Sequence, residues 1–243
     1  METRVNRVRR ARACDERDRT LADDEIRALG QLIPAACLSR SIESVVRVML
    51  ACGTHLGETV MTRWTDRDFE ARTWTIPKEH AKSKAATTIH LSDFALAQFV
   101  GQQAVRAGFP EGDIRREYVF PSRQGKNPHV SINRVCRAIR DRQRPQDAPT
   151  NGGTMVMDAL TVAGGQWKCH DLRRTCGTTM QSMGVQESIV HRCLNHARNN
   201  PLDRIYLRFD YEAQMRDAWR KWGDHLAILL GIDTGNVRFL FAP

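Results

Sequence analysis

A histidine and an arginine stand three positions apart in the stretch HDLRR, which spans residues 170–174. On a helix this spacing places His170 and Arg173 on one face, so an imidazole and a guanidinium fork can bind one anion together. Taken alone the pattern is common, and solvated charges on a helix explain it better. Later residues change that balance, because a second histidine, His196, follows in CLNH and a tyrosine, Tyr206, follows in DRIYLR.

The elements that would position these side chains are mostly helical. Thr20 followed by Asp23 resembles a capping box ahead of an amphipathic helix, and Ser41 opens a second helix that Gly53 stops. Ser92 caps a further helix. Helical periodicity continues in four later stretches, which are VSINRVCRAIRDR, HDLRRTCGTTMQSMG, QESIVHRCLNH and EAQMRDAWRKWGDHLAILLG.

A β-hairpin interrupts this helical pattern. From Phe69 on, the stretches FEARTWTIP and ATTIHLS alternate and carry β-branched or aromatic residues, and the basic stretch KEHAKSKA separates them. Lysines therefore stand at the hairpin tip. YVFP (118–121) predicts a short extended segment, and the aperiodic residues 144–165 predict a long loop. We expect a mostly α fold with a small antiparallel β-sheet, in the α+β class.

Composition narrows the range of functions. The chain has 243 residues, a net charge of +9 and a pI near 9.6, which predicts binding to a polyanion. No segment approaches ~20 consecutive apolar residues and no signal peptide opens the chain, so we expect a cytoplasmic protein and no membrane partner. Its seven cysteines are odd in number and lack a CxxC pair, which favours reduced thiols. The spacing of Cys and His between residues 169 and 196 does not suit zinc.

A series of stretches resembles the catalytic domain of the tyrosine recombinases, or phage integrases, of prophages and genomic islands. The likeness covers residues 18–228 and depends on the order of its parts, each of which is weak alone. The stretches are TLADDEIRAL, the GE of HLGETV, RWTDRDFEARTWTIPKEHAKSK, TIHLSDFAL, VFPS, HDLRRT, CLNHA and IYLRFDYEAQMRDAW.

The resemblance implies site-specific DNA recombination and integration on behalf of a mobile genetic element. In this family a tyrosine hydroxyl cuts DNA, leaves a 3′-phosphotyrosine link and rejoins the strand to another 5′-hydroxyl, and no metal or nucleotide cofactor is needed. Such a reaction has three physical requirements, which hold for any catalyst. The transition state gains negative charge and needs fixed cationic donors, the leaving oxygen needs a proton, and the phenol must lose one.

The resemblance makes Tyr206 the nucleophile, because this tyrosine follows His196 at the family's interval. Tyr211 is its nearest competitor, and packing beside a short strand explains Tyr118. A core aromatic with a wet hydroxyl is the plainer interpretation of Tyr206. That interpretation leaves the order of the motifs unexplained.

The remaining roles follow from the same resemblance. Arg173 would clamp the scissile phosphate, His170 would accept or relay the tyrosine proton, and His196 would donate a hydrogen bond to the phosphate. Lys82 in HAKSK would protonate the leaving oxygen, with Lys84 as the alternative if the turn register slips. A solvated lysine and a helix-end histidine are the plainer interpretations of the lysine and of His196.

The chain departs from the family at its first catalytic position. The family has arginine two residues before Gly-Glu, whereas this chain reads His55-Leu56-Gly57-Glu58. Histidine offers one donor and is mostly neutral at pH 7, while arginine offers a permanent charge and two parallel donors. Loss of one such donor costs about 10²–10³ in rate. Protonation of His55 by the phosphate's field would give weak activity at lower pH, so we expect an impaired enzyme.

The expected organisation is a basic N-terminal arm or linker remnant at 1–19, a catalytic domain at 20–228 and a C-terminal tail at 229–243. Family members usually carry DNA-binding domains ahead of the catalytic one, so we expect affinity and site selection to suffer here. The expected partners are double-stranded DNA and either a homo-oligomer, a tetramer on paired sites, or a full-length integrase. The apolar run in 223–243 suits segment exchange between subunits or packing within one chain. The alternative function is a catalytically inactive DNA-binding remnant or accessory protein, and a zinc-binding regulator is a third.

Overall fold

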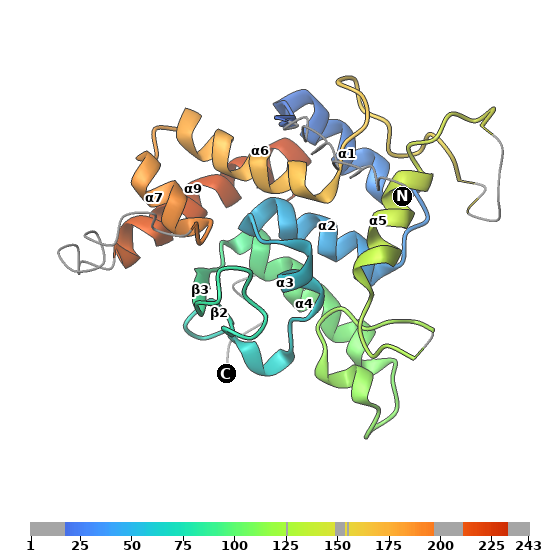
Figure 1. Ribbon diagram of the computed structural model, residues 1–243, viewed down its shortest axis with the longest axis horizontal. Coiled ribbons are helices and arrows are strands. Elements are labelled where there is room, and N and C mark those ends of the chain that lie inside the picture. Colours follow the sequence, from blue (N-terminus) through green and yellow to red (C-terminus); the bar gives the residue numbers. More distant parts are fainter. Residues whose placement is uncertain (1–17, 125, 149–153, 155, 197–210, 233–243) are drawn as a thin grey trace, which may run out of the picture.

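The computed structural model describes residues 18–124, 126–148, 154, 156–196 and 211–232. In this part of the chain most of the ordered backbone is helical (Figure 1). The helices are α1 (Asp23–Ala35), α2 (Arg40–Cys52), α3 (Leu56–Val60), α4 (Asp93–Ala107), α5 (Ile132–Asp141), α6 (Cys169–Ser182), α7 (Glu187–Cys193) and α9 (Glu212–Leu230).

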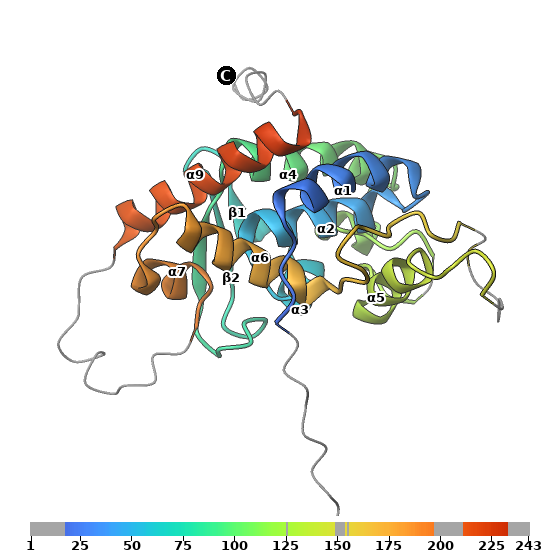
Figure 2. The ribbon, with the colours of Figure 1, turned by 90° about the horizontal axis from the view of Figure 1, so that it is seen from above.

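Helix α2 is the centre of the fold. Its stretch RSIESVVRVMLAC is apolar around most of its circumference, so it is buried by neighbours on several sides. It packs against α4, α6, α9 and α3. Figure 2 shows α9, α4 and α1 on one side of α2, with α3, α5 and α7 on the other. The side with α3, α5 and α7 is the one that carries the predicted site residues.

The N-terminal cap of α2 is not the predicted one. Ser39 holds the cap position, and its hydroxyl accepts a hydrogen bond from the Ile42 N–H. Ser41 lies inside the helix, where its hydroxyl donates to the Pro121 carbonyl at 2.9 Å. The predicted stop is confirmed, because Gly53 adopts φ 63°, a left-handed conformation that glycine reaches without a steric cost.

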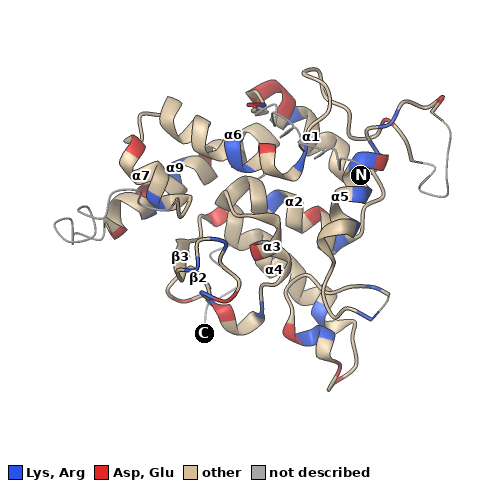
Figure 3. Ribbon diagram, viewed as in Figure 1, with Lys and Arg blue, Asp and Glu red and all other residues tan. Residues whose placement is uncertain are grey.

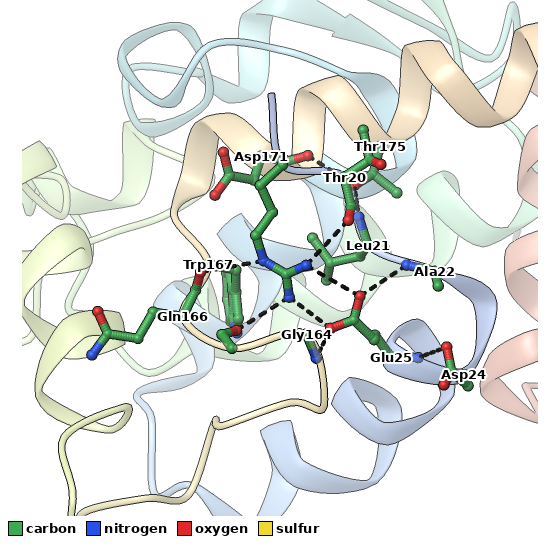
Figure 4. A network of polar contacts seen from close by, with 12 residues as sticks. Thr20, Leu21, Ala22, Asp24, Glu25, Gly164, Gln166, Trp167, Asp171 and Thr175 are labelled. Carbon is green, nitrogen blue, oxygen red and sulfur yellow. Dashed lines mark hydrogen bonds and ion pairs between the residues drawn. The ribbon is translucent and has the colours of Figure 1, made fainter. Parts of the chain in front are cut away.

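The start of α1 also differs from the prediction, and a buried carboxylate explains why. Glu25 accepts the Ala22 N–H at 3.0 Å, so the helix begins at Asp23 and Thr20 stays outside the cap. The same carboxylate accepts the Gly164 N–H at 2.8 Å and pairs with the Arg19 guanidinium at 2.6 Å (Figure 4). The chain ahead of α1 is thereby joined to the loop that leads into α6.

The sheet has three antiparallel strands in the order β1-β2-β3, one more than the predicted hairpin. They are β1 (Arg67–Asp68), β2 (Thr73–Ile76) and β3 (Thr87–His90). The predicted first strand begins too early, because Phe69 lies in the turn between β1 and β2 and Arg72 adopts φ 55° before β2 starts. The small antiparallel sheet in a mostly helical chain confirms the predicted fold class.

The other predicted helices are present in the described chain. Ser92 caps α4 and Ser131 caps α5, each by accepting a backbone N–H in the first turn. In the YVFP stretch Tyr118 and Pro121 form isolated antiparallel bridges with Arg63 and His129, and the chain bends at the two residues between them, so no continuous strand forms. No helix in the described ranges is long and apolar enough to cross a membrane.

Helix α9 closes the fold against α2 and the start of α4. The Trp222 indole donates to the Leu50 carbonyl at 2.8 Å, and both side chains are buried. A Cβ at Gly223 would come within 2.1 Å of the Ser92 hydroxyl, so only glycine allows this approach. Leu229 is also buried, so the first part of the apolar run in 223–243 packs within the chain. Residues 233–243 lie outside the described range.

Candidate active site

An open cavity of about 680 Å³ lies between α6, the end of α7, α3 and the β2–β3 loop. Figure 1 shows these elements facing one another across the front of the molecule. The structure brings together every predicted site residue that it describes, and each one lines this cavity. They are His55, Lys82, His170, Arg173 and His196.

His55 holds the cap position of the short helix α3, so its backbone is fixed while its imidazole takes no part in the cap. Its N–H donates to Glu58 Oε2 at 2.9 Å, and its carbonyl accepts from the Thr59 N–H at 3.0 Å. The imidazole stacks on that of His170, with ring centroids 5.8 Å apart and ring planes 9° from parallel. Two imidazoles from distant parts of the sequence therefore stand side by side in the cavity.

The loop that carries Lys82 is fixed by the same carboxylate. Glu58 Oε1 accepts the Lys82 N–H at 3.0 Å, so one buried glutamate joins α3 to the β2–β3 loop. From the other side, the Asn195 amide donates to the Ser83 hydroxyl at 2.7 Å. The side chain of Lys82 is exposed and lines the cavity, whereas Lys84 is not among the described lining residues.

Arg173 is buried, with only 5% of its surface exposed. Its Nη1 donates to the Gly53 carbonyl and its Nη2 donates to the Leu194 carbonyl. These bonds use two of the five N–H donors of the guanidinium and leave the others for an anion in the cavity. Burial lowers the pKa of Arg173 and Glu58 raises it, and a guanidinium stays charged under such shifts.

The start of α6 is held by the segment before α1. The Leu21 N–H donates to the Thr175 hydroxyl at 2.8 Å, and that hydroxyl donates to the Asp171 carbonyl at 2.8 Å (Figure 4). Asp171 is buried and accepts the Lys168 N–H at 2.9 Å, which caps the helix. These contacts fix the turn of α6 that carries His170 and Arg173.

His196 follows α7 and belongs to a short chain of polar side chains. Its Nδ1 lies 3.0 Å from Nδ1 of His191, and Nε2 of His191 lies 3.2 Å from a carboxylate oxygen of Glu187. The backbone between the two histidines turns through Asn195, which has φ 51°. His191 also lines the cavity.

The electrostatics of the cavity favour neutral imidazoles at His55, His170 and His196 in the free protein. Burial, followed by the charges of Arg173 and Lys82, lowers the pKa of His55 to about 3. Burial and Arg173 lower the pKa of His196 to about 4. The pKa of His170 is lowered by burial and then by Arg174 and Arg173. Positive charge in the free cavity therefore comes from arginine and lysine, and an incoming anion would favour protonated histidines.

Tyr206, the predicted nucleophile, lies outside the described residues. Of the described tyrosines, neither Tyr118 nor Tyr211 lines the cavity. The Tyr118 hydroxyl accepts a hydrogen bond from Arg63 at 3.2 Å. The Tyr211 ring lies under the guanidinium of Arg192, whose Cζ is 4.3 Å from the ring centroid.

Sequence reasoning missed three residues that organise the cavity. Glu58 was visible as part of Gly-Glu, but nothing in the sequence predicts that its two oxygens join His55 to the Lys82 loop. Asn195 and His191 belong to the stretch around His196, and their contacts depend on how the chain turns after α7. The only sequence signal for these two residues was the close spacing of polar residues from Glu187 to His196.

Comparison with known proteins identifies the family. The profile of the phage integrase family matches residues 19–213 of this chain. The prophage integrase IntA of Escherichia coli (strain K12) is 26% identical over 218 residues. That alignment spans 90% of this chain and 46% of the relative, so the chain covers about half the length of that protein.

Solved structures share the fold at low sequence identity. The XerA recombinase superposes with a TM-score of 0.57 at 15% identity, over 83% of this chain and 64% of that one. The integrase of mycobacterium phage Brujita gives 0.55 at 18% identity, over 88% and 62%. The XerH site-specific recombinase, bound to its difH substrate in a pre-cleavage complex, gives 0.54 at 17% identity, over 80% and 51%. The chain therefore belongs to the phage integrase family, with the fold of a tyrosine recombinase catalytic domain.

Proposed function

We propose that this chain cuts and rejoins double-stranded DNA through Tyr206, in site-specific recombination or integration by way of a 3′-phosphotyrosine intermediate. The observation that carries the proposal is the meeting of Lys82, His170, Arg173 and His196 in one cavity. These residues come from three separate parts of the chain. A set of isolated surface charges would have no reason to converge in this way.

The chemistry can be assigned to these side chains step by step. The tyrosine oxygen attacks phosphorus, its proton passes to His170, and the bond from phosphorus to the 5′-oxygen breaks. Lys82 gives a proton to that leaving oxygen. Arg173 and His196 donate to the non-bridging oxygens, where negative charge grows in the transition state. Rejoining to another 5′-hydroxyl reverses each proton transfer and needs no external energy source.

The fixed positions of these donors support the assignment. The Arg173 guanidinium is held in place by its bonds to two carbonyls. It is therefore preorganised to donate to a phosphate at one fixed position in the cavity. Figure 3 shows arginines on α5 and α6, and positive charge of this kind suits the DNA backbone. The family's assembly as a tetramer on paired DNA sites is part of the same proposal.

His55 makes the proposed enzyme a slow one. It stands in the arginine position of the family pattern, with a pKa lowered to about 3, so in the free protein it offers a neutral ring. A neutral imidazole supplies one hydrogen bond and no charge to the phosphate. This observation favours a second candidate function, a DNA-binding protein of the same fold that does not cut.

Covalent trapping on DNA separates the two functions. Supercoiled plasmid is incubated with the wild type, Tyr206→Phe, Tyr211→Phe or His55→Arg, quenched with detergent and examined for protein bound to nicked strands. We expect a weak adduct from the wild type, a stronger one from His55→Arg, an unchanged one from Tyr211→Phe and none from Tyr206→Phe. DNA binding without an adduct in any of them would overturn the proposal in favour of the second function. An adduct that survives Tyr206→Phe and fails in Tyr211→Phe would move the nucleophile to Tyr211.

A further inference from the structure

Glu187, His191 and His196 form a row of polar side chains whose contacts determine which ring nitrogen of each histidine carries a hydrogen. Nε2 of His191 lies 3.2 Å from the Glu187 carboxylate, and its Nδ1 lies 3.0 Å from Nδ1 of His196. The two rings are 5.0 Å apart between centroids. His191 has no role in the chemistry described above, although it lines the same cavity.

An ionised carboxylate only accepts hydrogen bonds, so Nε2 of His191 must carry a hydrogen to bond Glu187. A neutral His191 then has a lone pair at Nδ1. That lone pair can bond Nδ1 of His196 only if the hydrogen of His196 is on Nδ1. The Nε2 atom of His196 is left with a lone pair, and a lone pair cannot donate to a phosphate oxygen.

One added proton reverses this arrangement wherever it binds. If it binds His191, the Nδ1–H of His191 donates to Nδ1 of His196, whose own hydrogen moves to Nε2. If it binds His196, that ring carries hydrogens on both nitrogens. In both cases Nε2 of His196 becomes a donor, since the hydrogen bond at one ring nitrogen sets the state of the other.

We propose that His191, oriented by Glu187, is a positioning residue that lets His196 donate to a phosphate only after the histidine pair has gained one proton. The inference rests on the proposed function, because it gives His196 its phosphate ligand. Proton uptake and phosphate binding then become one event, and the cavity reaches its donating state when DNA is present.

The charges around the pair agree with this coupling. Partial burial and Arg173, His191, His170 and Lys82 lower the pKa of His196 to about 4, so in the absence of DNA the extra proton is disfavoured. Arg173 and His170 face His196 from α6, and Lys82 faces it from the β2–β3 loop. A phosphate between these groups offsets their charge and favours the proton. The Glu187 carboxylate faces His191 from the opposite side, 3.2 Å from its Nε2.

Nitrogen NMR of the histidine rings tests the inference without any need for turnover. Protein labelled with ¹⁵N at histidine is recorded at pH 7.5 without DNA, as wild type, His191→Phe and Glu187→Gln. We expect His196 in the wild type to carry its hydrogen on Nδ1. His191→Phe removes the partner and should move that hydrogen to Nε2, the site that free histidine prefers in water. Glu187→Gln should give a mixture, because an amide can also donate to Nε2 of His191.

A second measurement follows the proton itself. Calorimetric titration with duplex DNA in two buffers of different ionisation enthalpy should show about one proton more taken up by the wild type than by His191→Phe. A hydrogen on Nε2 of His196 in the free wild type would overturn the inference. So would equal proton uptake in the two proteins. Absence of DNA binding would instead contradict the proposed function, while the NMR result would still decide the proton's place.

Discussion

The two walls of the cavity hold their functional groups in opposite ways. On the α6 wall the side chain itself is fixed, because the Arg173 guanidinium is buried and bonded to the carbonyls of Gly53 and Leu194. On the facing wall the backbone is fixed, because Glu58 accepts the N–H groups of His55 and Lys82 and bonds neither side chain. A group with a permanent charge can be locked in place. Lys82, which gives a proton to the leaving oxygen in the proposed reaction, keeps an exposed side chain.

The largest effect is expected from breaking the α6 wall. Arg173→Ala removes a buried cation and leaves two inward-facing carbonyls without their donors, which should destabilise the fold by ~2–4 kcal/mol. The same change removes a fixed phosphate donor and should lower covalent trapping by at least about 10²–10³. Chemical denaturation and the trapping assay measure the two losses.

Arg173→Lys is the matched control for that prediction. Lysine keeps the charge but cannot bond both carbonyls and a phosphate with one planar group. We expect part of the stability to return and most of the trapping defect to remain. Full trapping in Arg173→Lys would show that a positive charge alone is sufficient at this position. It would contradict the view that the α6 wall must hold its cation in one fixed geometry.

On the facing wall the sharpest change is a gain. His55→Arg restores a permanent charge and a second donor beside the phosphate, and should raise the trapping rate by about 10²–10³. The cap position of α3 is maintained by the backbone of residue 55, so the fold should tolerate the change. His55→Lys is the control, since it adds charge without the planar fork. An equal rate in wild type and His55→Arg would mean that the imidazole already suffices.

Glu58→Gln tests the link between His55 and the Lys82 loop. The amide can accept one of the two N–H groups but presents N–H to the other, so a loss of ~1–2 kcal/mol is expected. Trapping should fall further than this stability loss explains, because the Lys82 loop loses its anchor. Glu25→Gln is a matched control, a buried capping carboxylate that does not line the cavity. A similar fall in trapping in both variants would assign the effect to stability alone.

Local patterns predicted the fold class, whereas the resemblance to the tyrosine recombinases singled out the five described residues that line one cavity. Apolar periodicity located α4, α5 and α6, and the hydroxyl of Ser92 was a sufficient cap signal. The caps of α1 and α2 were misplaced because several hydroxyl and carboxyl residues compete there, and tertiary bonds such as Ser41 to Pro121 decide between them. The tie from Glu58 to the Lys82 loop spans 24 positions and has no sequence signal.

The smallest of the expected effects comes from the protonation of two cavity histidines, His55 and His196. Burial and neighbouring cations hold the pKa of His55 at about 3 and that of His196 at about 4, both below the ordinary value of 6.5. As the pH falls below that value, these histidines bind protons in the unfolded chain but not in the folded one. The free energy of unfolding must therefore decrease as the pH decreases. As the pH falls from 7 to 5, the unfolded chain should come to bind up to about two more protons at these two residues than the folded chain binds.

Urea denaturation at half-unit steps between pH 7 and 5 measures this slope, in a range where most carboxylates stay ionised. The double variant His55→Asn/His196→Asn should flatten it. His90→Asn is the comparison: this buried histidine lies outside the cavity and its pKa is lowered too, so its removal should flatten the slope by a smaller amount. A slope that changes with His90→Asn alone would place the proton-sensitive stability elsewhere in the fold. A slope that changes more with the double variant than with His90→Asn would show that the cavity holds His55 and His196 neutral at a cost in stability that a bound phosphate can offset.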